Sequence, residues 1–422
     1  MRKVYLDYAA TTPVAPEVRK AMRPYWAKFF GNPAAMYAYG QVARQAVEAA
    51  REKLAGFFHF DPEEIIFTSG ATESNNLALR GVVKGVKNYV EQHKDRFYLQ
   101  KSADKTQSFI PHIITTPFEH HCLLDTAKDL LRGEAEVTFI DLNRSGVAAP
   151  KEIQKQIKPN TVLVSVMYVN NEIGTVAPLA DIAKLMGQER ARRKLAAAKT
   201  GKEPLPLYLH SDITQAVNYL ACDMLKLGVD LFSLSAHKVY GPKGVGAFGV
   251  KKDVKIEKIQ FGGSQEFNLR AGTHNVTGIV GMGTAIERIA GLKTEETKKI
   301  KQLRDYFWKQ LQKNVRHVSL NGSFTERVAN NLNVSFAGVE GESVLLGLDM
   351  AGIACSTGSA CSSETLEPSH VLLSIGLTHP EAHGSLRFTL GEGNTRADID
   401  YSVAQIAQVV MKLRKISGLF AN

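Results

Sequence analysis

Short β-rich runs alternate with longer amphipathic segments through the first two thirds of the 422-residue chain. In the longer segments, such as residues 41–57, 72–90 and 179–194, the apolar residues recur at helical spacing. The short runs are apolar on both faces and are residues 65–68, 113–115, 137–140, 162–166, 207–209, 231–234 and 246–250. This alternation predicts an α/β fold in which helices cover a mostly parallel, seven-stranded sheet.

The character of the sequence changes in its last third. A charged helical segment at 295–314 and a strand-like run at 331–336 lead there to a final helix. This order predicts a second, smaller α+β domain, as expected for a chain that is longer than one ordinary domain. We expect residues 15–294 to form the large domain, and residues 1–14 and 295–422 to form the small domain.

Composition narrows the class of protein. With 44% hydrophobic and 22% charged residues we expect a compact fold, and no apolar run reaches the ~20 residues of a membrane-spanning helix. The first residues, including Arg2, Lys3 and Asp7, turn polar too early for a signal peptide, so we expect a cytoplasmic protein. The four cysteines are too scattered for a disulfide framework, and Cys355 and Cys361 lack zinc-knuckle spacing, so no metal is expected.

The net charge of +10 is unevenly distributed along the chain. Residues 84–105 carry six basic and three acidic side chains, and residues 187–206 carry six basic and two acidic side chains. We interpret both segments as solvated helix ends and loops. A docking surface for an acidic partner or for tRNA stays open as the alternative, but no aromatic residues are interleaved with the charges, so direct nucleic-acid binding is not expected.

The strongest local signal is Lys238, at the point where a strand runs into a loop rich in glycine and proline. A partly desolvated lysine near other cations exposes a neutral amine, which can form a Schiff base with an aldehyde cofactor. Ser235 and His237 flank this lysine with groups that can bind a phosphate. Taken alone, Lys238 could equally be a surface lysine.

Asp212 closes the preceding strand, 26 residues before Lys238. A carboxylate there could keep a pyridine nitrogen protonated, which makes the ring of pyridoxal phosphate (PLP) an electron sink. Gln215 would reach the phenolic oxygen of the same ring. The alternative is that Asp212 only caps a helix.

Polar residues also follow three other predicted strands. Small residues at 68–75 place free backbone N–H groups at the start of a helix, which suits an anion or an ordinary capping box. His120 could stack on a cofactor ring and move protons, although a lone histidine is more often structural. Asn171 could bind a substrate carboxylate or the ring oxygen. The carboxyl ends of parallel strands meet at one edge of the sheet, where such folds build their sites.

In order and content these segments resemble the class-V aminotransferases of PLP fold type I, and within that family the cysteine desulfurases of the IscS/NifS type. The resemblance runs from residues 5–13 through 30–33 and the segments above to 399–401, nearly the whole chain. One departure is Phe267-Asn268, which stands where the family usually has a charged residue and a glycine.

The resemblance implies roles for individual residues. It places PLP on Lys238, the residue that would also move the substrate proton with His120, and it places Asp212, Gln215 and His120 against the cofactor ring. The implied phosphate ligands are Ala71, Thr72, Ser235 and His237, joined across a homodimer interface by Thr273. Arg387 would grip the substrate carboxylate, with Asn171 as its helper.

Cys361 decides the reaction that the resemblance implies. In this family the matching cysteine rides on a mobile loop and attacks the substrate sulfur, and a cysteine in so polar a run is an unusual core residue. We therefore expect a cysteine desulfurase that converts L-cysteine to L-alanine and holds the sulfur on Cys361 as a persulfide. The expected acceptor is an iron–sulfur scaffold or a tRNA-thiolation enzyme.

Two alternatives stay open at this point. Another class-V PLP enzyme, a selenocysteine lyase or an aminotransferase, would share the fold and the cofactor. A catalytically silent sulfur-transfer scaffold would keep the fold without turnover.

Overall fold

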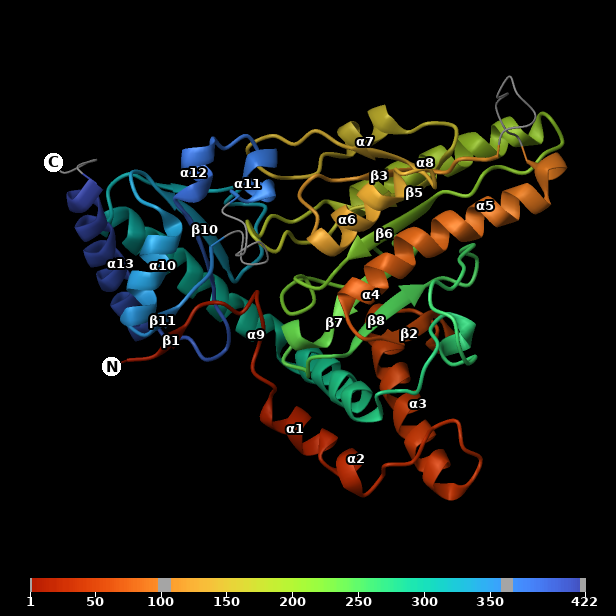
Figure 1. Ribbon diagram of the computed structural model, residues 1–422, viewed down its shortest axis with the longest axis horizontal. Helices are drawn as coiled ribbons and strands as arrows, with labels where there is room; N and C mark the ends of the chain where they lie inside the picture. Colours follow the sequence, from red (N-terminus) through yellow and green to blue (C-terminus); the bar gives the residue numbers. More distant parts are fainter. Residues whose placement is uncertain (1, 98–107, 358–366, 418–422) are drawn as a thin grey trace.

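A seven-stranded sheet lies at the centre of the computed structural model, which describes residues 2–97, 108–357 and 367–417 (Figure 1). The strand order is β2-β8-β7-β6-β5-β3-β4. All neighbouring pairs are parallel except those of β8, which runs antiparallel to β2 and β7. The predicted mostly parallel sheet is therefore confirmed. Its strands are β2 (Ile65–Thr68), β3 (His112–Thr115), β4 (Glu136–Phe139), β5 (Thr161–Ser165), β6 (Tyr208–Asp212), β7 (Leu231–Ser235) and β8 (Gly246–Val250).

Successive strand residues pack into two different cores, because side chains alternate across a sheet. Ile114 and Val164 belong to one core, and their neighbours Ile113 and Leu163 belong to the other. The strands therefore carry apolar residues on both faces, which is why they appear in the sequence as short, largely apolar runs.

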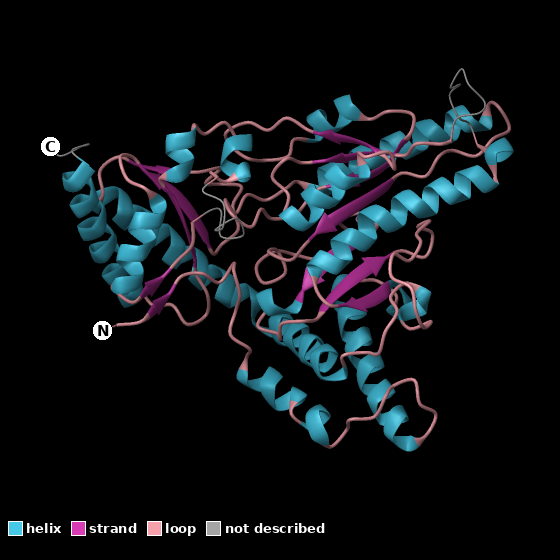
Figure 2. Ribbon diagram, viewed as in Figure 1, coloured by secondary structure: helices cyan, strands magenta, loops and turns pink. Residues whose placement is uncertain are grey.

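Helices cover both faces of the sheet (Figure 2). On one face the core includes side chains of α3 (Ala38–Phe58), α8 (Leu179–Ala198) and α9 (Val276–Asn314). On the other it includes side chains of α5 (Val82–Gln92) and α6 (His121–Leu130). The remaining elements of this part are α1 (Pro16–Met22), α2 (Pro24–Ala27), α4 (Ala71–Asn76), α7 (Pro150–Gln156) and the short 3₁₀ helices η1 (Pro62–Glu64), η3 (Lys94–Arg96), η4 (Ala236–Lys238) and η5 (Glu266–Asn268). A π-helical segment, η2 (Leu77–Gly81), joins α4 to α5.

A three-stranded antiparallel sheet forms a third core with the ends of the chain. Its order is β12-β10-β9, and β1 pairs separately with β11 in parallel. The apolar side chains of this core combine Val4 and Leu6 with residues from Ile300 onward. The elements of this core are β1 (Val4–Tyr5), β9 (Val318–Leu320), β10 (Asn331–Phe336), β11 (Ile353–Ala354), β12 (Ser385–Thr389), α10 (Gly341–Met350) and α13 (Arg396–Ser417). The buried side chains of α11 (His370–Ser374) and α12 (His379–His383) instead pack in the core that contains side chains of α3, α8 and α9.

One predicted helix boundary is wrong. The helix expected at 295–314 begins at Val276, where the side chain of Asn275 accepts a hydrogen bond from the Gly278 N–H and caps the first turn. As a result α9 runs without a break past residue 294 and links the two regions of the chain. Within the described ranges, none of the helices has both the length and the apolar character that crossing a bilayer requires.

Candidate active site

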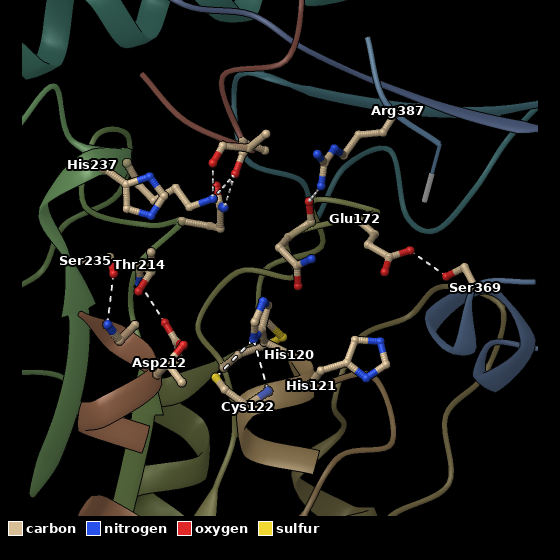
Figure 3. Close-up of a pocket in the computed structure, with 18 of the residues that line it drawn as sticks. His120, His121, Cys122, Glu172, Asp212, Thr214, Ser235, His237, Ser369 and Arg387 are labelled. Carbon is tan, nitrogen blue, oxygen red and sulfur yellow. Dashed lines mark hydrogen bonds between the residues drawn. The ribbon is translucent and has the colours of Figure 1, made fainter. Parts of the chain in front are cut away.

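A cavity of about 360 Å³ opens at the carboxyl edge of the seven-stranded sheet (Figure 3). Most of the residues predicted for the site line this one cavity, and they come from six separate stretches of the chain. They are Ala71, Thr72, His120, Asn171, Asp212, Gln215, Ser235, His237, Lys238 and Arg387. Asp212, Ser235 and His237 lie at one end of the view in Figure 3 and Arg387 at the other, with His120 between them.

Two predicted residues are not among those lining the cavity. Cys361 lies outside the described residues. Thr273 is exposed, and it follows η5, in which Glu266, Phe267 and Asn268 all have positive φ angles (48°, 53° and 65°). Asparagine tolerates that left-handed region better than most residues, which explains how Asn268 replaces the glycine usual in the family.

Asp212 ends β6 with its carboxylate held from two sides. Its Oδ1 accepts from the Thr214 N–H at 2.9 Å, and its Oδ2 accepts from Asn75 Nδ2 at 2.7 Å. The residue is 6% exposed. These bonds fix a carboxylate in the cavity wall, where it can pair with a cationic ring nitrogen.

Lys238 ends η4, directly after β7, and its amine points to the N-terminal segment. Nζ donates to the carbonyls of Ala9 and Ala10 at 2.5 and 2.6 Å. Gln215 Nε2 donates to the same Ala9 carbonyl at 3.0 Å. Ala9 and Ala10 therefore form part of one wall of the cavity and orient Lys238, the one lysine among the described residues that line it.

The predicted phosphate end is built where two loops approach closely. The Ala71 N–H donates to Ser235 Oγ at 2.9 Å. A side chain at Gly246 would meet the backbone of Gly70 at 2.5 Å, so glycine is needed for this approach. Burial, and secondarily Lys238, lowers the pKa of His237 to about 4, which leaves a neutral ring that can donate a hydrogen bond.

Arg387, in β12, lies at the opposite end of the cavity. Nη1 donates to the Asn171 carbonyl at 2.9 Å and Nη2 donates to Asp7 Oδ1 at 2.8 Å. Arg387 Nε and Asn171 Oδ1 are buried and have no hydrogen-bond partner in the described part of the protein. Buried polar atoms normally have partners, so this corner is suited to a polar ligand.

Sequence reasoning missed nine of the described residues that line this cavity, and four of them form two contacting pairs. Glu172 and Ser369 form a hydrogen-bonded pair beside Arg387, and burial raises the pKa of Glu172 to about 7. The rings of His121 and His370 lie 4.5 Å apart between centroids. His121 follows the predicted residue His120 in the sequence, whereas nothing in the sequence places Ser369 or His370 at this cavity.

The residues present fit PLP. Asp212 can pair with the ring nitrogen, Lys238 supplies the amine, and backbone and hydroxyl groups at Ala71, Thr72 and Ser235 can bind the phosphate. Thr214 Oγ1, also in the cavity wall, is a buried polar atom without a partner among the described residues. The volume falls in the usual range for small-molecule sites, roughly 300–1,000 Å³.

Known proteins share this architecture. Residues 4–96 and 99–401 match the family described as aminotransferase class-V. The chain belongs to the class-V aminotransferase family. It is 44% identical over 416 residues to the cysteine desulfurase IscS of Dictyoglomus turgidum, covering 99% of this chain and 96% of the relative. A solved NifS-like protein superposes with a TM-score of 0.82 at 32% identity, covering 97% of this chain and 99% of that one.

A second solved structure, described as "SspA in complex with cysteine", has a TM-score of 0.75 and is 32% identical, covering 92% and 99% of the two chains. Membership of the class-V aminotransferase family confirms the PLP fold type and the PLP dependence expected from the sequence. The desulfurase relatives confirm the enzyme class, a PLP-dependent cysteine desulfurase.

Proposed function

We propose that this enzyme removes the sulfur of L-cysteine, releases L-alanine and holds the sulfur on Cys361 as a persulfide. The observation that carries the proposal is one cavity that contains the carboxylate of Asp212, the amine of Lys238 and a guanidinium nitrogen of Arg387 that has no partner among the described residues. PLP, when bound, supplies an electron sink for the substrate carbon.

The protein's own residues would hold the cofactor and the substrate in position relative to each other. Asp212 and Gln215 would hold the cofactor ring and His120 would stack on it, while Ala71, Thr72, Ser235 and His237 would bind its phosphate. Arg387 would bind the substrate carboxylate through its guanidinium group, with Nε as one donor, and the Asn171 amide would lie beside it. The substrate amino group then faces Lys238, whose Nζ is already oriented by two carbonyls.

Proton and sulfur transfers follow from this arrangement. Lys238 would take the proton from the substrate Cα, with His120 as its partner. The Cys361 thiolate would attack the substrate sulfur, so that a sulfur–sulfur bond forms as the Cβ–S bond breaks. The electron pair of the broken bond returns to the substrate, and protonation of the carbon gives alanine.

We also propose a homodimer in which Thr273 reaches the partner's phosphate site. Thr273 is exposed and does not line the cavity of its own chain. Large exposed apolar side chains support an interface, because a monomer rarely exposes so many in neighbouring segments. They are Trp26, Phe30, Met36, Tyr37 and Tyr39, together with Phe261 and Phe267 near Thr273. Light scattering in solution should give twice the chain mass, and a monomeric mass would exclude the shared site.

Three finer proposals accompany this function. The acceptor would be an iron–sulfur scaffold or a tRNA-thiolation enzyme, as the IscS name of the relatives suggests. The location would be the cytoplasm, which fractionation of cells tests. The large domain would be residues 15–294, and the third core, which joins Val4 to residues beyond Ile300, supports assigning the N-terminal residues to the small domain.

The deciding experiment measures sulfide and alanine from L-cysteine with dithiothreitol, at matched PLP loading. Cys361→Ala should keep its yellow cofactor and lose sulfide release, whereas Cys222→Ala, a buried cysteine outside the cavity, should behave as the wild type. Full activity of Cys361→Ala would overturn the persulfide step and favour a lyase or transaminase acting on another substrate.

A further inference from the structure

One side-chain nitrogen bridges two groups of the cavity. Asn75 Nδ2 donates to Asp212 Oδ2 at 2.7 Å and to Cys122 Sγ at 3.1 Å, and Asn75 is fully buried in α4. An ionised carboxylate only accepts hydrogen bonds, so the amide nitrogen and not the oxygen must face Asp212. The two amide protons are therefore both committed, one to the carboxylate and one to the sulfur.

The thiol of Cys122 continues the chain of contacts to His120. Its sulfur lies 3.0 Å from His120 Nδ1, and the Cys122 backbone N–H donates to the same nitrogen at 3.2 Å (Figure 3). Burial raises the pKa of the thiol to about 12, so the sulfur keeps its proton. Asn75 donates to the sulfur, and the Thr72 side chain also forms a hydrogen bond that lowers the pKa of the thiol, as a donor to the sulfur does. The thiol proton is therefore directed to His120 Nδ1.

These directions fix the tautomer of His120. Burial is the main influence on the ring and lowers its pKa, Lys238 and His121 lower it further, and Asp212 and Asp125 raise it. The neutral ring has one N–H. Since Nδ1 accepts from two donors, that N–H must be on Nε2.

We propose that Asn75 and Cys122 are positioning residues, which join Asp212 to His120 in one hydrogen-bonded chain and hold the His120 proton on Nε2. The inference rests on the proposed roles of Asp212 and His120. The proposal gives His120 and Lys238 different roles in the reaction. His120 presents an N–H donor and not a lone pair to the cavity, so Lys238 is the base that takes the substrate proton.

The alternative role for Cys122 requires a thiolate and not a thiol. A thiol this close to the cofactor site could carry sulfur itself, but that needs a thiolate, which burial disfavours most and the nearby Asp212 carboxylate disfavours further. The two readings differ in whether Cys122 is ever modified.

The direct test is ¹⁵N NMR of the histidine-labelled holoenzyme, with His120→Asn used to assign the resonance. The wild type should show His120 neutral with its proton on Nε2. Cys122→Ala should shift the Nδ1 resonance, Cys122→Ser should restore it because a hydroxyl also donates, and Cys222→Ala should leave it unchanged. A proton on Nδ1 in the wild type, or no shift in Cys122→Ala, would overturn the proposal. The tautomer of the wild type is measured without the Cys122 variants, so the test still holds if a Cys122 variant misfolds.

Turnover provides the second measurement. Loss of one supporting hydrogen bond should lower kcat of Cys122→Ala about three- to tenfold with little change in KM, and Cys122→Ser should recover most of it. Mass spectrometry after turnover should find no added sulfur on Cys122, and persulfide there would overturn the positioning role. If the wild type has the expected tautomer but is inactive, only the proposed function is contradicted. If the wild type is active but has the other tautomer, only this inference is contradicted.

Discussion

The Ser369 hydroxyl donates a 2.5 Å hydrogen bond to Glu172 Oε2, although 197 positions separate the two residues in the chain. Ser369 also caps α11, since its Oγ accepts from the Leu372 N–H at 3.2 Å. The backbone carbonyl of Glu172 in turn accepts from Asn331 and Asn333 in β10. This pair therefore ties together the loop after β5, α11 and the three-stranded sheet at the substrate end of the cavity.

Ser369→Ala should destabilise the protein by about 1–3 kcal/mol, because it removes a helix cap and leaves the buried Glu172 carboxyl without its donor. Ser374→Ala, in the same helix, is the matched control, since among the described residues that hydroxyl bonds to the Val371 carbonyl alone. Thermal unfolding should give a clearly lower Tm for the first variant alone. Equal values would show that the Ser369–Glu172 bond is energetically neutral.

Glu119 should make the stability of the protein depend on pH. Burial raises the pKa of this carboxyl to about 8, even though its Oε1 accepts from Thr116 Oγ1 and the Met167 N–H. The folded state therefore holds a proton that the unfolded chain releases above about pH 4.3, the ordinary value for glutamate. The stabilisation is complete below that pH and is lost as the pH rises through about 8.

Glu119→Gln removes this titration and can keep both donors at its amide oxygen. The free energy of unfolding of Glu119→Gln, relative to that of the wild type, should therefore rise between pH 4.5 and 8 and then level off. The rise should be on the order of 1 kcal/mol per pKa unit of the shift. Denaturant titrations across that range measure it. A constant difference would mean that Glu119 is ionised throughout.

Periodicity and strand-end residues predicted much of this structure, because both depend on local sequence. The run at 331–336 became β10 with the same limits, and Lys238, Asp212 and His120 meet because parallel strands end at one edge. Local sequence does not show which strands pair, so the antiparallel β8 was not expected. Ser369 and His370 were missed because only tertiary packing brings them to Glu172 and Glu119. Cys122 could have been found, since a cap side chain commonly accepts from the N–H two residues on.

Arg387→Lys should weaken substrate binding more than turnover. The guanidinium has two nitrogens tied to Asn171 and Asp7, which leaves Nε oriented into the corner, and a lysine amine cannot reproduce this fork. Losing a charge-assisted bond should raise KM for L-cysteine about ten- to hundredfold. Arg132→Lys, at an exposed site, should leave KM unchanged. An unaltered KM in Arg387→Lys would place the substrate carboxylate elsewhere.

The buried ion pair between Arg51 and Glu266 should decide whether the loop carrying Thr273 keeps its shape. Arg51 Nη2 donates to Glu266 Oε1 at 2.7 Å, Glu266 also accepts from His274, and Phe267 and Asn268 follow with left-handed backbone. Arg51→Met leaves a buried carboxylate without its main partner, which should cost about 3–5 kcal/mol. The double variant Arg51→Met with Glu266→Gln removes both charges and should therefore be more stable than Arg51→Met alone, by thermal unfolding. If the destabilising effects of the two substitutions instead add, the ion pair does not hold this loop, and Thr273 is exposed for another reason.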